Sequence, residues 1–297
     1  MNLQELLDRA EARLDAAALS YGHGTTNARD EAAWLVLWSL GMPLDSDLDG
    51  VAHTVPTDEQ VREAEALVTR RIDTRQPAAY LTREAWLQGV PFYVDERAIV
   101  PRSFIAELIA DGGFDAWLGE DTHRVLDLCT GNGSLAVLAA MAWPDIAVTG
   151  ADLSPDALAV ARINVERHGL HDRIKLTESD GLAACPGPWD LVLCNPPYVN
   201  SGSMAALPPE FRAEPELALA GGDDGMDFVR ALLRDLPSRL SPHGVLVLEI
   251  GHERPFFEAA FPQLEVVWLS TSAGDDQVLL LTAQALQAFA CPTDSRQ

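Results

Sequence analysis

Residues 125–134 read VLDLCTGNGS, an apolar stretch of strand character that runs straight into a glycine-rich turn. An apolar segment of helical character, Leu135 to Met141, follows at once. From Arg124 onward predicted strands and helices alternate in this way, which indicates a parallel sheet with crossover helices. Glycines let such a turn close tightly and let a ligand approach the backbone, although Gly-Asn-Gly alone is a weak signal. The spacing differs from the G-x-G-x-x-G dinucleotide fingerprint.

Polar residues stand at the ends of four successive predicted strands in this part of the chain. The predicted strands span residues 125–129, 146–150, 174–178 and 189–194. The polar residues at their ends are Asp127, Asp152, Asp180 and Asn195. In open parallel sheets ligands bind outside the carboxyl ends of the strands, so these residues mark a candidate ligand site.

Two of these aspartates have a more specific interpretation. Asp152 follows the glycine turn by about 20 residues, where an acidic side chain accepts hydrogen bonds from ribose hydroxyls. Helix capping is the alternative, but Ser154 already provides the expected N-cap before Pro155. Asp180 is placed to accept from an adenine amino group, and an ordinary turn aspartate before Gly181 explains it equally well.

Residues 189–198 read WDLVLCNPPY, a strand-like run that ends in two prolines. Proline cannot donate a ladder hydrogen bond, so Pro196 and Pro197 end the strand and stiffen the turn. The side chain of Asn195 and the carbonyl of Pro196 then offer two converging acceptors, which suit a planar NH2 group. Tyr198 can cover the flat face of that group, so the motif predicts methylation of an amide or amino nitrogen. A strand-ending turn with no chemistry is the alternative.

The first 82 residues are predicted to form a separate helical domain that recognises the partner. Its predicted helices span residues 3–14, 32–40 and 57–71. Thr57 and Gln60 have the spacing of a capping box at the start of the third helix. The glycine-rich loop 21–27, YGHGTTN, could cradle phosphate, but no strand precedes it. We therefore interpret it as a plain interhelical loop.

A β-hairpin linker, residues 83–101, is expected to join this domain to a second domain, residues 102–297. Its turn is predicted at residues 89–91, Gly-Val-Pro. Ser103 is the expected N-cap of a helix that runs to about residue 118.

The segment that follows Tyr198, residues 199–225, shows no clear periodicity. A long structureless loop is usually functional, so we predict a substrate-contacting lid. The last predicted strands, residues 264–269 and 277–281, have no helix between them, which indicates an antiparallel edge. The second domain is therefore expected to be an α/β domain built on a mostly parallel sheet.

Composition limits the class of protein and partner. The 297 residues are 47% hydrophobic and 22% charged, which supports a sizeable core. No signal peptide is recognised and no apolar run reaches the roughly 20 residues of a membrane span, so we expect a cytoplasmic protein with no membrane partner. The net charge of −24 disfavours DNA and favours a basic partner, and a surface adapted to solubility or to salt is the alternative. The four cysteines lack zinc spacing, so no metal site is expected and reduced thiols are the simplest reading.

The motifs at the strand ends resemble those of the class I S-adenosylmethionine-dependent methyltransferases that act on amide or amino nitrogens. Over residues 1 to about 285 the chain is similar to the protein-(glutamine N5) methyltransferases. The shared features include the helical first domain, Ala79-Tyr80-Leu81, Glu214-Pro215, the glycines at 221–225 and Glu249-Ile250-Gly251. Residues 100–108, VPRSFIAEL, with the 21–25 loop, look like the branch that modifies large-subunit ribosomal protein L-three.

The resemblance implies a fold, a cofactor and a set of site residues. The fold would be Rossmann-like, with a seven-stranded, mostly parallel sheet and an antiparallel edge strand. S-adenosyl-L-methionine would be bound by Asp127, Cys129, Gly131, Gly133, Asp152, Leu153, Asp180, Gly181 and Asn195. Catalysis would use Asn195, Pro196, Pro197 and Tyr198. The glutamine substrate, in a basic ribosomal protein, would be bound by Asn195, Pro196, Tyr198 and Glu214.

Several alternatives stay open at this point. Cys129 stands where many relatives have glycine, which the ribosomal-protein branch tolerates. Phe92 and Arg102 either contact ligand or are simply a packed aromatic and a solvated arginine. The runner-up substrate is a peptide-chain release factor, and another class is adenine-N6 methylation of nucleic acid, which normally needs a basic groove. A cofactor-binding assembly factor without turnover is a further alternative.

Overall fold

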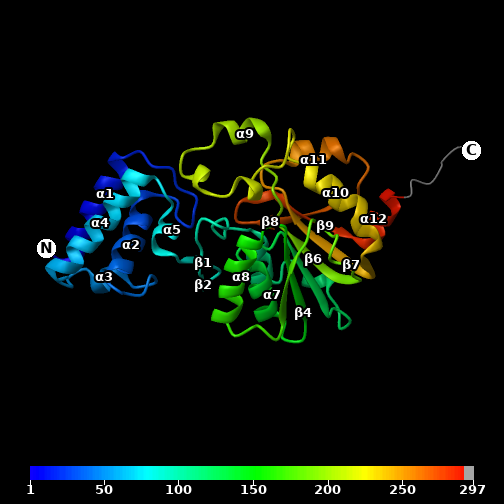
Figure 1. Ribbon diagram of the computed structural model, residues 1–297, viewed down its shortest axis with the longest axis horizontal. Coiled ribbons are helices and arrows are strands. Elements are labelled where there is room, and N and C mark those ends of the chain that lie inside the picture. The colour runs from blue at the N-terminus through cyan, green and yellow to red at the C-terminus, as the bar shows by residue number, and fades with distance from the viewer. Residues whose placement is uncertain (291–297) are drawn as a thin grey trace, which may run out of the picture.

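Seven strands form one twisted sheet in the computed structural model of the chain, which describes residues 1–290 (Figure 1). The spatial order of the strands is β5-β4-β3-β6-β7-β9-β8. Their bounds are β3 (Arg124–Leu128), β4 (Ala147–Asp152), β5 (Ile174–Glu178), β6 (Trp189–Cys194), β7 (Leu240–Glu249), β8 (Val267–Thr271) and β9 (Gly274–Thr282). The chain order reverses between β3 and β6, and this is the switch point at which open sheets bind ligands.

Neighbouring strands from β5 to β7 are parallel, whereas β9 is antiparallel to both β7 and β8. The predicted mostly parallel sheet with an antiparallel edge is therefore confirmed. The edge is a hairpin because Ser272 and Ala273 leave no room for a crossover helix between β8 and β9. In the register of the central strands, Leu128 lies opposite both Ala151 and Cys194, so β3, β4 and β6 end at the same edge.

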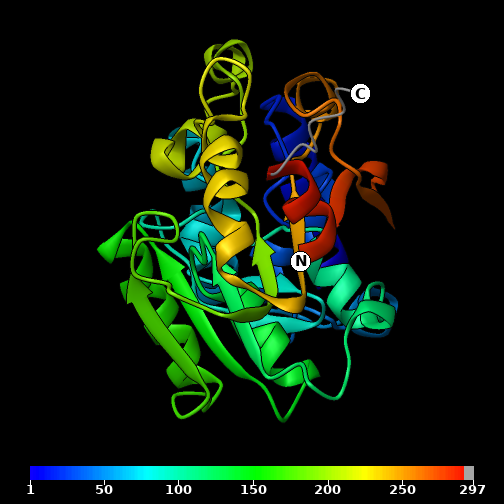
Figure 2. The same cartoon turned by 90° about the vertical axis from the view of Figure 1, so that its right-hand side faces the viewer.

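Helices cover both faces of the sheet, as the view in Figure 2 also shows. One face packs against α6 (Ile105–Asp111), α7 (Ser134–Ala142) and α8 (Pro155–Arg167). The other packs against α10 (Asp227–Asp235), α11 (Arg254–Ala260) and α12 (Ala283–Ala290). Side chains alternate between the two cores along each strand: Val125 faces the first and Leu126 the second. The near-continuous apolar strands of the sequence are thus explained by burial on both faces.

The N-terminal part is a small helical bundle with its own apolar core (Figure 1). Its helices are α1 (Leu3–Ala16), α2 (Ala28–Ser39), α3 (Leu48–Val51), α4 (Asp58–Thr74) and α5 (Ala78–Thr82). The capping box of Thr57 and Gln60 is present at the start of α4. Helix α2 begins four residues earlier than predicted, because the side chain of Asn27 caps it by accepting from the Asp30 N–H. The division of the chain at residue 82 stays a prediction.

The linker is a two-stranded hairpin, β1 (Ala85–Leu87) and β2 (Val90–Phe92). The predicted turn at residues 89–91 was wrong by one residue, because the turn is formed by Gln88 and Gly89. Both have positive φ, 50° and 72°, which gives a tight two-residue loop. Pro91 lies inside β2, where an edge position tolerates the missing N–H.

The predicted role of Ser103 as an N-cap was also wrong, and so was the predicted length of that helix. Phe104 holds the N-cap position of α6, and the left-handed Gly112 ends the helix at Asp111. The Ser103 hydroxyl donates instead to Glu249 Oε2, at 2.6 Å, while its oxygen accepts from the Ile105 N–H. This side chain therefore ties the end of the linker to the end of β7.

The predicted lid, residues 199–225, is not structureless. It contains α9 (Ser201–Ala206) and two short 3-10 helices, η2 (Phe211–Ala213) and η3 (Glu216–Ala218). Two further 3-10 helices, η1 (Asp115–Trp117) and η4 (Leu236–Ser238), follow α6 and α10. Within residues 1–290 no helix has both the length and the apolar character to cross a membrane.

Candidate active site

A cavity opens at the carboxyl edge of β3, β4 and β6, where the predicted site residues gather. Eight of those residues line it: Cys129, Gly131, Asp152, Leu153, Asp180, Gly181, Asn195 and Pro197. The other five do not line it: Asp127, Gly133, Pro196, Tyr198 and Glu214. The tertiary structure thus brings together the ends of four strands, although the individual roles of these residues stay predictions.

The glycine turn after β3 uses its two glycines differently. Gly131 has a φ of +55°, and a Cβ added there would meet no atom within 4 Å, so the backbone faces open space in the cavity. Gly133 has a φ of +81°, but an added Cβ would lie 3.1 Å from the Cβ of Ala161 on α8. Gly131 therefore lets a ligand approach, whereas Gly133 lets two helices pack.

Asp127 is buried beneath this turn and orders it. Its Oδ2 accepts from the Thr130 hydroxyl and, at 2.9 Å, from the Ala136 N–H. Its Oδ1 is buried and has no hydrogen-bond partner among the described residues. Burial raises the pKa of Asp127 to about 7, against the lowering effect of those two hydrogen bonds. Asp127 directly precedes Leu128, which lines the cavity. A buried acceptor oxygen without a donor at this place suits a positively charged ligand group.

Asp152, at the end of β4, is half-buried and faces the cavity. Its Oδ2 accepts from the Gly131 N–H and its Oδ1 from the Ser154 N–H, both at 2.9 Å. A carboxylate has about four acceptor positions, so lone pairs remain for two hydroxyls of a ligand. Asp180, after β5, is exposed at the cavity rim. Apolar side chains complete this part of the wall, including Leu153 and Leu217.

Cys129 has a φ of +61°, the left-handed conformation that favours glycine. This explains in physical terms why glycine suits the position. A hydrogen bond with Cys194 and burial raise the pKa of the Cys129 thiol well above its ordinary value. The thiol therefore stays protonated, and Cys129 serves as a wall of the cavity without nucleophilic character.

Asn195 follows β6 directly and lines the cavity, as Asp152 and Pro197 do. Pro196 is buried, and the Tyr198 hydroxyl reaches Glu249 at the end of β7. The Tyr198 hydroxyl lies 3.4 Å from Glu249 Oε1, which makes a long hydrogen bond. Burial and the nearby Glu249 carboxylate raise the pKa of Tyr198, so its hydroxyl remains a donor.

Glycines crowd the tyrosine from three sides, which explains two motifs that the sequence left without a role. A Cβ added at Gly251 would lie 2.6 Å from the Tyr198 ring, and one at Gly225 would lie 2.2 Å from its carbonyl oxygen. A Cβ at Gly221 would lie 2.7 Å from the Tyr198 Cα. Only glycine fits at these positions, so the lid glycines and Gly251 fix where the tyrosine sits.

Glu214, expected to bind substrate, is engaged within the protein. Its Oε1 accepts from the Val100 N–H at 2.9 Å and from Arg102 Nη1 at 2.6 Å. Its Oε2 accepts from Arg102 Nη2 at 2.7 Å and lies 3.4 Å from His23 Nε2. Burial alone would raise its pKa, but the Arg102 guanidinium and the His23 ring hold the pKa at about 2. Its role toward substrate stays a prediction.

The two residues left open in the linker region have intramolecular contacts. Phe92 is fully buried in the core of the sheet domain, with its ring centroid 5.5 Å from that of His168. Arg102 pairs with Glu214. Neither lines the cavity.

Sequence reasoning missed three linker residues that do line the cavity, Arg97, Ala98 and Ile99. No pattern in the sequence indicates that the linker folds over the strand ends. The contact is held by Asn164 of α8, which is fully buried. Its side chain accepts from the Tyr93 N–H and donates to the carbonyls of Tyr93 and Asn132. A polar residue on the buried face of a predicted helix was the one available signal.

Comparison with known proteins agrees with this geometry. The model of the methyltransferase small domain family matches residues 115–212. The ribosomal protein uL3 glutamine methyltransferase of Bordetella pertussis is 52% identical over 290 residues, covering 96% of each chain. That of Burkholderia pseudomallei is 50% identical, covering 97% of this chain and 96% of its own.

The chain belongs to this family of glutamine methyltransferases. The predicted resemblance is confirmed, and so is the class I methyltransferase fold. Among solved structures, the hMettl16 catalytic domain superposes with a TM-score of 0.51 at 15% identity, covering 76% of this chain and 81% of its own. At that level of identity the likeness concerns the fold alone.

Proposed function

We propose that the protein transfers a methyl group from S-adenosyl-L-methionine to the side-chain nitrogen of a glutamine in ribosomal protein uL3. The observation that carries the proposal is the motif Asn195-Pro196-Pro197-Tyr198 at the end of β6, whose Asn195 and Pro197 line the strand-end cavity, in a chain whose relatives are named for this reaction. The negative net charge of −24 supports a basic protein substrate.

The residues of the cavity fit the proposed cofactor. Asp152 keeps free lone pairs for the two ribose hydroxyls, and Asp180 at the rim can accept from an adenine amino group. The open backbone at Gly131 leaves room for the methionine part, and the acidic strand ends favour its positive sulfonium. When bound, the cofactor supplies an electrophilic methyl group. These assignments come from the resemblance to the methyltransferase family, and the free acceptors and open backbone of the cavity are consistent with them.

The chain's own residues would orient the amide. An amide nitrogen is a weak nucleophile because its lone pair is delocalised. Asn195 Oδ1 and the Pro196 carbonyl would each accept one N–H of the glutamine, aiming its nitrogen into the cavity. Such orientation contributes about 7–11 kcal/mol at best. The two fixed acceptors also stabilise the positive charge that develops on the nitrogen.

The test is methyl transfer from labelled S-adenosyl-L-methionine to free uL3, to a release factor and to DNA, assayed side by side. We expect label on uL3 alone. Asn195→Ala should lower the rate about 10²–10³-fold by removing one fixed acceptor, while calorimetry shows cofactor binding retained. Label on the release factor would assign the other branch of the family. Loss of cofactor binding in the variant would show that Asn195 is structural.

A further inference from the structure

The two ends of the lid, residues 199–225, lie side by side next to the active site, where Val199 pairs with Leu219 and Gly221; we call this pairing the base of the lid. The Val199 N–H donates to the Leu219 carbonyl at 2.8 Å, and the Gly221 N–H donates to the Val199 carbonyl at 2.9 Å. Between these residues the chain extends toward the helical N-terminal bundle (Figure 1). The base is closed within the sheet domain, so the position of the outer part depends on other contacts.

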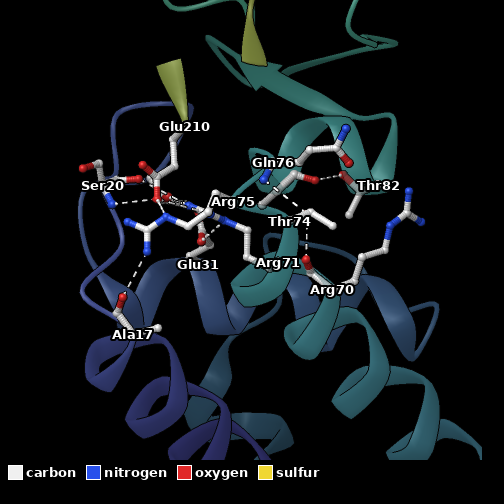
Figure 3. A network of polar contacts seen from close by, with 12 residues as sticks. Ala17, Ser20, Glu31, Arg70, Arg71, Thr74, Arg75, Gln76, Thr82 and Glu210 are labelled. Atoms are coloured by element: carbon white, nitrogen blue, oxygen red, sulfur yellow. Dashed lines mark hydrogen bonds and ion pairs between the residues drawn. The ribbon is translucent and has the colours of Figure 1, made fainter. Parts of the chain in front are cut away.

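The first of those contacts is Glu210, whose side chain is fully buried against the N-terminal bundle. Figure 3 shows Glu210 reaching toward Arg71 and Arg75 of the α4 end, while Arg70 extends away. Glu210 Oε1 lies 2.9 Å from Arg75 Nε and 3.8 Å from Arg71 Nη1, and it accepts from the Ser20 N–H at 3.2 Å. A lid carboxylate therefore sits in a basic socket of the other domain.

Arg71 is itself buried, and two hydrogen bonds within the N-terminal bundle fix its side chain. Its Nε donates to Glu31 Oε1 at 2.8 Å, and its Nη2 donates to the Ser20 carbonyl. Glu31 is fixed in turn by the Thr25 hydroxyl at 3.2 Å. The second oxygen of Glu210, Oε2, is buried and has no hydrogen-bond partner among the described residues. Burying such an oxygen costs free energy, so the contacts of Oε1 must offset that cost.

The second contact is the ring of Phe211, which rests on the glycine-rich loop of the N-terminal bundle. Its centroid lies 4.2 Å from that of His23, and a Cβ added at Gly22 would lie 3.0 Å from the Phe211 ring. Gly22 has a φ of +127°, which a larger residue rarely adopts. The loop that the sequence marked as a plain interhelical connection is thus shaped as a seat for the lid.

The third contact is Glu214, which joins His23 of the bundle to Arg102, the residue that follows the linker. The next residues of the lid turn back toward the active site. Pro215, Leu217 and Ala218 line the same cavity as Asp152 and Asn195. One wall of the cavity is therefore made by a segment that is held, at its outer end, by the N-terminal bundle.

We infer that Glu210 and Glu214 are positioning residues through which the N-terminal bundle builds one wall of the cofactor site. The inference rests on the proposed function for the identity of the cofactor. It gives the N-terminal bundle a task in cofactor binding in addition to substrate recognition. Neither carboxylate lines the cavity, so both act through the segment 215–218.

The arrangement makes a specific kinetic prediction. Loosening the lid should weaken cofactor binding while leaving Asn195 in place, because Asn195 is fixed by β6 and its prolines. The dissociation constant of the cofactor should therefore rise more than kcat falls at saturating cofactor. A coupling between two sites is typically 5- to 150-fold, so we expect a change of about tenfold.

The first variant is Glu210→Gln, which keeps the shape of the side chain and removes its charge. Glu216→Gln is the matched control, because Glu216 lies in the same segment and is exposed. Two readouts are needed: calorimetric affinity for S-adenosyl-L-methionine, and hydrogen exchange of residues 207–220 without cofactor. Glu210→Gln should weaken binding about tenfold and speed exchange. The control should match the wild type in both.

A second pair of variants approaches the same contact from the N-terminal bundle. Arg75→Met removes the charge opposite Glu210, and Arg70→Met is its control on the same helix. Arg75→Met should reproduce the weaker binding although Arg75 does not line the cavity. Arg75→Met also removes the hydrogen bonds that Arg75 donates to the Ala17 and Ala18 carbonyls, which lie within the N-terminal bundle. Its effect on cofactor affinity should still add little to that of Glu210→Gln, since both changes break the contact between Arg75 and Glu210. Because Arg75 lies outside the lid, Arg75→Met still tests the inference if Glu210→Gln does not fold.

The outcomes separate the inference from the proposed function. If the wild type does not bind the cofactor, the proposed cofactor is wrong and the inference fails with it. Should the wild type bind and both variants bind equally well, with unchanged exchange, the inference alone is refuted. Weaker binding with faster lid exchange in both variants, and in neither control, supports it.

Discussion

Replacing Glu214 by glutamine should destabilise the protein by about 3 kcal/mol at neutral pH. The magnitude follows from the pKa of this buried carboxyl, which falls from its ordinary 4.5 to about 2. Converted by linkage, that difference corresponds to about 3 kcal/mol of stability. An independent argument agrees, because removing one partner of a buried ion pair, here with Arg102, costs about 3–5 kcal/mol.

The sign of the pH dependence is fixed by the direction of the shift. A depressed carboxyl pKa contributes stability that is present above the unfolded value, about 4.5, and lost as pH falls through 2. The assay is urea unfolding of wild type and Glu214→Gln from pH 7 to pH 3.5, followed by circular dichroism. The difference between the two should shrink steadily below pH 5.

Glu216→Gln is the control, because it removes an exposed carboxylate two residues away and should change stability by no more than about 0.5 kcal/mol. A loss below 1 kcal/mol for Glu214→Gln, or a difference independent of pH, would refute the reasoning. Either result would mean that Arg102 and His23 do not hold the carboxylate in the way the distances indicate.

Three further predictions concern stability and cofactor affinity. Burial raises the pKa of Glu249 to about 7, so its contribution to stability is complete below about pH 4.5 and is lost progressively as pH rises through 7. Glu249→Gln should therefore flatten the fall in stability between about pH 4.5 and 7, and an unchanged slope there would contradict this. Gly133→Ala should cost about 1–3 kcal/mol, because its Cβ would press on Ala161. Gly131→Ala strains the backbone at a φ of +55° but meets no atom, so it should cost less stability and should also weaken cofactor binding; urea unfolding and calorimetry separate the two effects. Asn164→Ala should lower the free energy of unfolding by about 2–3 kcal/mol, since three hydrogen bonds to the linker and the glycine turn are lost. A thermal midpoint like that of the wild type would show that Asn164 does not hold the linker in place.

Much of the site was predictable because its residues belong to short local sequence patterns. A strand that runs into glycines, or into two prolines, places its last polar residue at the carboxyl edge whatever the rest of the chain does. Parallel pairing then puts Asp152 and Asn195 beside the same cavity. Where prediction failed locally, as at Ser103, a distant partner had taken the side chain: its hydroxyl donates to Glu249 on β7.

The lid shows what local patterns leave open. Residues 199–225 have no periodicity because their order comes from contacts with distant residues: Glu210 with Arg75, Phe211 with His23 and Glu214 with Arg102. Each contact joins residues about a hundred or more positions apart, so no window of sequence contains both partners. Arg97 was not predicted as a cavity residue for the same reason, because it reaches the cavity only where the linker folds over the strand ends.

Local sequence patterns specify the alternation of strands and helices, the helices of the N-terminal bundle and the two motifs at the sheet edge. These depend on periodicity and on the backbone limits of glycine and proline, which act over a few residues. Long-range contacts in the folded chain determine which carboxylates face the cavity and which form ion pairs within the protein. Asp152 and Glu214 are both acidic residues near a turn, yet burial beside Arg102 commits Glu214 to the protein, while Asp152 keeps lone pairs for a ligand. Burial and partners are properties of the folded chain, because they arise when segments distant in sequence meet.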